Sequence, residues 1–334
     1  GDKGQPPARP MPRMDYRDGI PDRARTLVVI PTMIGSAQEV ESLLERLEVH
    51  FLANRDKNIQ FGLLTDFKDS RMETEPGDGD LLKAATRGID ALNEKYASGR
   101  VDSFFLCHRP RRWNEKEQSW IAFERKRGKL CEFNQLLHGS GRDRFLLIRG
   151  NTLDRQERDG NVRYVITLDT DTQLPRDAAR KLVACMAHPL NQAVYDPARQ
   201  CVVSGYGIIQ PRVAITLPSA NRSLYSRLFC FDAGVDPYTR SVSDLYQDLF
   251  RQGSYTGKGI YDLATFEQAV GGRFPENTIL SHDLIEGCYA RSGLASDILL
   301  YEEFPSCYSA EVKRRHRWIR GDWQILPWLF PFVR

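Results

Sequence analysis

The sequence lacks three features that would each define a class of protein. It has no apolar run of about 18 residues or more, so no helix of this chain is expected to span a membrane. Its seven cysteines form no C-x-x-C pair and are odd in number, which argues against a disulfide framework or zinc site and favours a reducing compartment. The net charge of +3 over 334 residues is too small to indicate nucleic-acid binding.

The two ends of the chain differ in composition from its middle. Residues 1–24 are polar and proline-rich, which predicts a flexible N-terminal segment. Residues 323–334 are apolar and aromatic, and Trp and Phe favour the membrane interface. We therefore expect a soluble piece of a larger protein whose tail contacts a membrane. Packing of this tail on the protein core is the alternative.

Apolar patterning in the first half predicts a β-α-β unit. Residues 25–31 and 58–67 are continuous apolar runs typical of buried strands, and the segment between them has apolar residues at helical spacing. Strands joined in this way run parallel, with a right-handed crossover. The predicted fold class is α/β, with a Rossmann-like, mixed and mainly parallel central sheet flanked by helices.

Later segments add further elements to this prediction. Residues 144–151 and 162–169 are two strand-like runs around a polar stretch, which predicts a hairpin. Residues 202–213 read as one strand, and residues 310–326 as a basic amphipathic helix.

The pair Asp169 and Asp171, which follows the apolar run YVITL, is the leading candidate for a metal site. In open α/β sheets, ligands bind where strands end. Two carboxylates one residue apart can hold one Mg²⁺ or Mn²⁺, while phosphate oxygens complete the coordination. Such a metal would neutralise charge on a departing diphosphate. A metal-free acidic turn is the alternative.

The same D-T-D-T letters also fit a different enzyme class. They look like the haloacid-dehalogenase phosphohydrolase motif, with Asp169 as the nucleophile and Asp171 as the general acid. In those enzymes the motif usually lies near the start of the domain, whereas roughly half of this chain precedes it. We therefore keep the phosphohydrolase as the weaker alternative.

Charged residues before the D-x-D predict a nucleotide site. Asp66 closes the second apolar run and is suited to accept hydrogen bonds from a base or ribose. Lys126 and Arg127 lie in a basic turn that can meet phosphate. The alternatives are a strand-end turn for Asp66 and a solvated helix start for the two cations.

Two later motifs predict the acceptor side. Asp283 in SHDLIEG is suited to act as a general base, and helix capping is the alternative. Arg314, Arg317 and Trp318 share one helical face by spacing. Arg can clamp a diphosphate and Trp can stack on a sugar, while lipid-headgroup binding is the alternative.

Taken in order, these motifs resemble the processive, inverting glycosyltransferases of the cellulose and hyaluronan synthase type. The closer resemblance is to the glycosyltransferase domain of cyclic β-1,2-glucan synthases. It is carried by FERKRGKLCEFNQLLHG, YVITLDTDTQLPRDAARKLV, GKGIYDLATFE and RRHRWIRGDWQ. The resemblance implies a GT-A fold over residues 25–322, with a nucleotide-binding half at about 25–172 and an acceptor-side half at about 173–322.

The resemblance also implies a chemistry. UDP-glucose would be the donor, Mg²⁺ or Mn²⁺ would bind Asp169 and Asp171, and Asp283 would deprotonate a β-1,2-glucan acceptor. The implied donor-binding residues are Pro31, Thr32, Asp66, Lys126, Arg127, Asp169, Arg314, Arg317 and Trp318. The implied acceptor-binding residues are Tyr255, Thr256, Gly257, His282 and Trp318. The rest of a membrane-embedded synthase would be the partner, at the cytoplasmic face of a bacterial inner membrane.

The chain departs from the family pattern at two residues. His282 stands where the family has an acid, and Arg314 where it has Gln. Residues 139–162 look like an insertion. Two further alternatives stay open: another membrane-linked β-glycan synthase, and a domain that binds a nucleotide sugar without turning it over.

Overall fold

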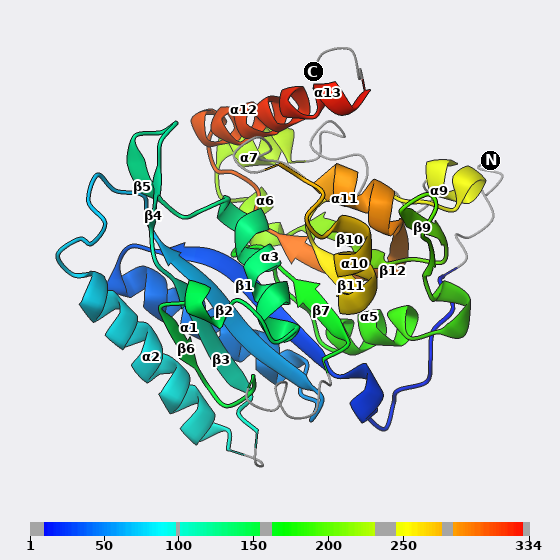
Figure 1. The fold of residues 1–334 in the computed structure, drawn as a ribbon, viewed down its shortest axis with the longest axis horizontal. Coiled ribbons are helices and arrows are strands. Elements are labelled where there is room, and N and C mark those ends of the chain that lie inside the picture. The colour runs from blue at the N-terminus through cyan, green and yellow to red at the C-terminus, as the bar shows by residue number, and fades with distance from the viewer. Residues whose placement is uncertain (1–9, 98–100, 154–161, 231–244, 276–282, 330–334) are drawn as a thin grey trace. The chain divides into compact units, whose positions relative to one another are not determined.

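The protein is described here from a computed structural model, which covers residues 10–97, 101–153, 162–230, 245–275 and 283–329 (Figure 1). The chain divides into two compact units. The first comprises Asp18–Thr170, and the second comprises Asp171–Arg334 together with Gly1–Arg17. Within the described ranges, no helix combines the length and apolar character needed to cross a membrane.

The first unit contains strands in the order β7-β1-β2-β3-β6. Their bounds are β1 (Thr26–Ile34), β2 (Ile59–Phe67), β3 (Phe104–Arg109), β6 (Leu147–Arg149) and β7 (Tyr164–Thr167). β7, β1, β2 and β3 run parallel, and β6 runs antiparallel to β3. A separate ribbon pairs β4 (Arg112–Asn114) with β5 (Ser119–Ile121).

Helices α1 (Ala37–Ala53) and α2 (Asp78–Lys95) connect the parallel strands. Helix α1 begins where the Ser36 hydroxyl accepts a hydrogen bond from the Glu39 N–H at 3.2 Å, which satisfies a donor that the first turn leaves unpaired. Its buried stripe recurs at steps of three and four residues, as expected: Val40, Leu43, Leu47 and Phe51. The predicted β-α-β unit is therefore confirmed.

Neighbouring phenylalanines on β3 show that α1 and α3 (Arg125–Leu137) cover opposite faces of this sheet. Phe104 contacts Phe51 of α1, with ring centroids 4.8 Å apart. Phe105 stacks on Phe133 of α3 at 5.9 Å. Successive side chains of a strand point to opposite faces, so the two helices lie on either side of the sheet, as Figure 1 also shows.

The second unit has a smaller group of strands centred on β10 (Ile208–Ile215). β10 runs parallel to β12 (Ser292–Glu302) and antiparallel to β11 (Gly259–Asp262). A short ribbon pairs β8 (Val194–Asp196) with β9 (Cys201–Ser204). The strands of the first unit are mainly parallel and those of the second are mixed, and the predicted α/β class is confirmed.

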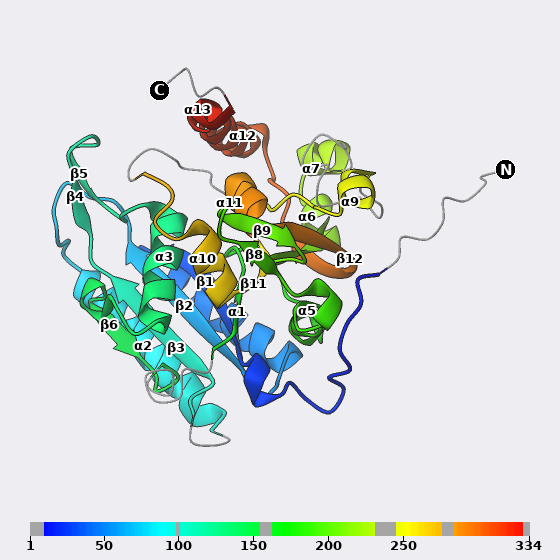
Figure 2. The ribbon, with the colours of Figure 1, turned by 45° about the vertical axis from the view of Figure 1, so that its right-hand side comes forward.

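Helix α5 (Ala178–Met186) packs against all three strands of this group, and α10 (Leu263–Val270) packs against α11 (Asp283–Ala290) (Figure 2). The described part of the unit also contains α6 (Leu217–Ala220), α7 (Leu224–Phe229), α9 (Leu245–Phe250), α12 (Tyr308–Gln324) and α13 (Leu326–Leu329). Short 3-10 turns occur at Asp22–Ala24, Arg142–Arg144 and Pro189–Asn191.

Two predicted strand arrangements are wrong. The hairpin expected from residues 144–151 and 162–169 does not form, because β6 pairs with β3 while β7 pairs with β1. The single strand expected over residues 202–213 is broken into β9 and β10. Gly205, with φ +66°, lies between them in a conformation that an extended strand does not use.

Both ends of the described chain belong to the second unit and pack within it. The Met14 N–H donates to the Ala184 carbonyl at 2.9 Å. Near the other end, the Trp328 ring lies 5.7 Å from that of Phe274 and 6.4 Å from that of Tyr289.

Candidate functional site

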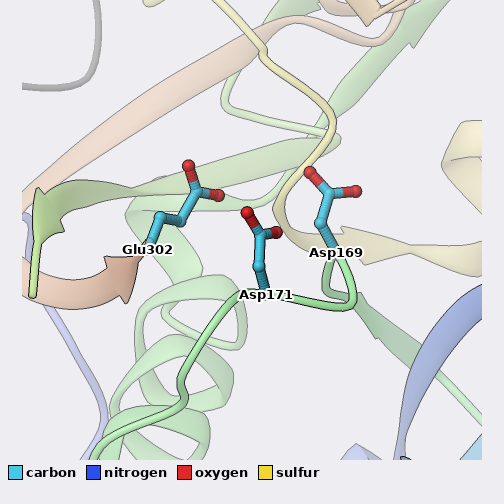
Figure 3. Close-up of side chains that lie close together, drawn as sticks. All are labelled: Asp169, Asp171 and Glu302. Carbon is cyan, nitrogen blue, oxygen red and sulfur yellow. The ribbon is translucent and has the colours of Figure 1, made fainter. Parts of the chain in front are cut away.

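Three carboxylates lie together at the predicted metal site (Figure 3). Asp169 and Asp171 follow the end of β7, and Glu302 is the last residue of β12. One carboxylate oxygen of each residue lies within 4.8 Å of the others. Oxygens bound to one octahedral Mg²⁺ or Mn²⁺ are about 3 to 4 Å apart, so this donor set fits such an ion after small side-chain movements.

Backbone pairing explains why the D-x-D turn meets the end of β12. The Gln173 N–H donates to the Tyr301 carbonyl at 2.7 Å, and the Tyr301 N–H donates back to Gln173 at 3.2 Å. This bridge places Thr172 next to Glu302, and the Thr172 hydroxyl donates to Glu302 Oε1 at 3.1 Å. Glu302 was missed in the sequence because the acidic pair in YEEFP read simply as the end of a strand.

Two lysines neutralise part of this acidic cluster. Lys126 Nζ lies 2.6 Å from Asp169 Oδ1. Lys258 Nζ pairs with Glu302 Oε1, and both of these side chains are mostly buried. Lys126 was a predicted donor-binding residue, whereas Lys258 was not predicted.

The candidate base, Asp283, is the first residue of α11 and contacts the 255–258 loop. Gly257 has φ +84°, and a Cβ built on it would lie 2.8 Å from Asp283 Oδ2. Only glycine allows this approach, because a side chain would clash with the carboxylate and strain the backbone. Gly257 touches Asp283 and Lys258 pairs with Glu302, so two consecutive residues connect the candidate base to the acidic cluster.

Gln210 of β10 fixes the conformation of this loop. Its side-chain oxygen accepts hydrogen bonds from the Thr256 N–H at 2.6 Å and from the Thr256 hydroxyl at 3.1 Å. Tyr255 is buried. The predicted acceptor residue His282 lies outside the described residues.

Asp66 belongs to a buried ion network in the first unit rather than to a solvent-facing strand end. Its side chain is 1% exposed. Arg109 donates to both of its oxygens, at 2.8 and 2.9 Å, and Lys129 Nζ lies 2.9 Å from Oδ2. Arg109 also bonds Glu132 at 2.8 Å, and Lys129 donates to the Thr32 carbonyl.

Burial and charge act in opposite directions within this network. Burial raises the pKa of Asp66, but the Lys129 and Arg109 cations outweigh it and hold the pKa below its ordinary value. Burial lowers the pKa of Lys129, although Asp66 opposes that shift. A charged network of this kind fixes the geometry at the ends of β1 and β2, where Pro31, Thr32 and Asp66 lie.

The remaining predicted cations have local partners. Arg127 pairs with Glu124 within the same turn. Arg314 lies 2.7 Å from Glu311, and its guanidinium lies 5.0 Å from the centroid of the Trp318 ring. The predicted shared helical face is therefore present for Arg314 and Trp318. Arg317 is exposed on the same helix, α12.

Comparison with known proteins extends the geometric description. No family model matches the chain. It is 48% identical over 317 residues, 95% of its length, to the cyclic beta-(1,2)-glucan synthase NdvB of Rhizobium meliloti. The chain spans 11% of the length of that protein. An identity this high over nearly the whole chain confirms the expected resemblance to a domain of a cyclic β-glucan synthase.

Proposed function

We propose that this chain is a glucosyltransferase domain that moves glucose from UDP-glucose to the 2-hydroxyl of a growing β-1,2-glucan. The observation that carries the proposal is the 48% identity to a protein named as a cyclic β-(1,2)-glucan synthase. In this proposal the domain works at the cytoplasmic face of the bacterial inner membrane, as part of a larger synthase. The apolar tail, residues 323–334, then contacts the membrane.

The donor is proposed to bind at the ends of β1 and β2. Pro31 and Thr32 border the nucleotide there. Both Asp66 oxygens already accept bonds from Arg109 or Lys129, and Lys129 also holds the Thr32 carbonyl. Asp66 is proposed to lie beside the base or ribose of the nucleotide, where its bonds to Arg109 and Lys129 also fix the end of β1.

The diphosphate is proposed to bind near the acidic cluster. A bound Mg²⁺ or Mn²⁺ supplies the charge that neutralises the departing diphosphate. Asp169, Asp171 and Glu302 would hold it, since their oxygens lie within 4.8 Å of one another. Lys126 and Arg127 are proposed to add positive charge for the phosphates. The same role is proposed for Arg314 and Arg317 of α12.

Asp283 is proposed to remove the proton from the acceptor 2-hydroxyl. The oxygen then attacks the anomeric carbon opposite UDP, so one displacement inverts α to β. Gly257 lies against the Asp283 carboxylate, and the hydrogen bonds between Thr256 and Gln210 hold the 255–258 loop in place. Tyr255, Thr256, His282 and Trp318 are proposed to border the acceptor.

Release of UDP tests this proposal directly. The protein is incubated with UDP-glucose and Mn²⁺ or Mg²⁺, and UDP and glucan are measured. We expect metal-dependent UDP release that Asp171→Asn abolishes. Asp80→Asn, at a mostly exposed aspartate of the other unit, serves as the matched control and should retain it.

Other outcomes favour the alternatives. Binding of UDP without turnover would support a nucleotide-sugar-binding domain. Release of inorganic phosphate from small phosphoesters would support the phosphohydrolase. Preference for another UDP-sugar would point to a different β-glycan synthase.

A further inference from the structure

Glu302 Oε1 is already fully engaged by protein groups. It accepts from the Thr172 hydroxyl at 3.1 Å and from Lys258 Nζ. A carboxylate oxygen offers about two lone-pair directions, so these two donors use both. A divalent cation therefore gains Glu302 Oε1 only if one donor leaves. The backbone bridge between Gln173 and Tyr301 holds Thr172 in place, whereas the ammonium of Lys258 lies at the end of a long side chain with several rotatable bonds.

We propose that Lys258 is a releasable counter-ion: it holds the Glu302 carboxylate while the cation site is without metal, and yields it when the metal binds. This inference rests on the proposed function, because it describes how the metal site of that reaction is regulated. Lys258 is a positioning residue in this scheme. Its ammonium, once released, adds positive charge for the diphosphate.

The charges of the cluster favour such an exchange. Three carboxylates face two ammonium groups, those of Lys126 and Lys258. These ammonium groups offset part of the negative charge of the metal-free cluster. A divalent cation adds two positive charges, which favours binding of a diphosphate. Binding of the metal and binding of the nucleotide are therefore coupled, because both depend on the charges of this cluster.

The backbone on both sides of Lys258 is held fixed, so that only its side chain needs to move. Gly257, with φ +84°, is pressed against Asp283. Gly259 has φ +143°, and a Cβ on it would lie 2.4 Å from the Ile209 carbonyl oxygen. The metal can therefore displace the ammonium without moving the loop that supports the candidate base.

Binding of Mn²⁺ alone, without any sugar nucleotide, tests the proposal. Free Mn²⁺ is counted by electron paramagnetic resonance for the unmodified chain, Lys258→Met and the control Lys181→Met, an exposed lysine of the same unit. If the ammonium occupies Glu302 in about nine molecules of ten, its removal tightens Mn²⁺ binding by about tenfold. The control leaves the affinity unchanged. In saturating Mn²⁺, Lys258→Met weakens UDP binding.

A double variant distinguishes competition from a general charge effect. On the Glu302→Gln background, Lys258→Met should give no tightening, because the contested ligand is gone. Unchanged or weaker Mn²⁺ binding by Lys258→Met alone would overturn the proposal, and so would equal tightening on both backgrounds.

A failure of the Lys258 variants to fold would also test the proposal. Lys258→Gln keeps a hydrogen-bond donor for Glu302 without the charge, and we expect it to bind Mn²⁺ more tightly as well. If both single variants fail to fold, Lys258 is part of the structural core and the proposal is wrong.

The two proposals fail in different ways. An unmodified chain that binds Mn²⁺ but releases no UDP would contradict the proposed function and leave the lysine exchange standing. An unmodified chain that binds no Mn²⁺ would overturn the lysine exchange, while the proposed function would still be decided by UDP release.

Discussion

At the scale of single residues, Gly257 has little freedom to change. Its φ of +84° disfavours any side chain, and the Asp283 carboxylate occupies the space a Cβ would need. Gly272 provides the comparison. It has φ +64°, and nothing lies within 4 Å of a Cβ built there. Comparison of an alanine substitution at each of the two glycines therefore separates the effect of backbone strain from the effect of displacing the candidate base.

We expect Gly257→Ala to lower turnover by tenfold or more and stability by about 1 to 2 kcal/mol. The methyl group pushes Asp283 away from its position. Gly272→Ala should cost a similar amount of stability and retain turnover. UDP release and urea unfolding measure the two effects. Equal activity of the two variants would show that the Gly257 contact does not position Asp283.

Asp283→Asn tests the chemical role of the same carboxylate. The amide nearly keeps the shape but cannot take a proton, and a general base typically contributes about 10²–10⁴ in rate. We expect UDP release to fall by that factor, while calorimetry finds UDP binding nearly intact. A variant that still makes glucan at the original rate would exclude Asp283 as the base.

At the scale of elements, Arg109 connects β2, β3 and α3. It bonds Asp66 on β2 and Glu132 on α3, and its side chain is 2% exposed. Removing one partner from a buried ion pair leaves a charge without compensation, which costs far more than losing an exposed pair. Arg149 on β6 makes an exposed pair with Asp90, with side chains 51% and 42% exposed.

We therefore expect Arg109→Met to lower the free energy of unfolding by about 3 to 5 kcal/mol. The matched change Arg149→Met should cost less than about 1 kcal/mol. Urea unfolding followed by circular dichroism measures both. Similar losses in the two variants would mean that the network does not stabilise the first unit.

At the scale of the whole molecule, the division into two units falls between Thr170 and Asp171, inside the D-x-D turn. Most of the predicted donor-binding residues belong to the first unit, whereas Arg314, Arg317 and Trp318 belong to the second unit with the predicted acceptor-binding residues. The ion network around Asp66 belongs to the first unit. The contact between Asp283 and Gly257, and that between Lys258 and Glu302, belong to the second.

The stability of the chain should depend on pH through His108. Burial lowers the pKa of this histidine to about 4, although the nearby Asp66 and Asp78 carboxylates oppose the shift. The unfolded chain has a histidine pKa of about 6.5, so it binds the extra proton first as the pH falls. Stability is therefore full above about pH 6.5 and declines towards pH 4, by up to about 3 kcal/mol.

Urea midpoints between pH 7 and pH 4.5 measure this decline. His108→Gln keeps a polar partner for the Thr65 hydroxyl, which lies 2.8 Å from His108 Nδ1, and should flatten the profile. Asp66 adds its own loss only at lower pH, because its pKa in the folded chain is held below the ordinary value. An unchanged profile in the variant would contradict the assignment.

Local patterns sufficed for the first β-α-β unit of the chain. Alternation of buried strand runs and an amphipathic helix predicted β1, α1 and β2, because each signal lies within one element. The wrong hairpin shows the limit. β6 and β7 are short apolar runs, and their partners, β3 and β1, are far away in the sequence. Pairing of this kind depends on which strands remain uncovered once the sheet forms.

The sequence by itself determined the α/β class, the D-x-D pair and the family resemblance, since these follow from periodicity and from ordered motifs. Only the tertiary structure determined which residues lie next to those motifs in space. It placed Glu302 and Lys258 at the acidic cluster and Gly257 under Asp283, and it buried Asp66 among cations. The physical reason is that charges separated by tens of residues or more interact strongly only when the fold brings them within a few ångströms.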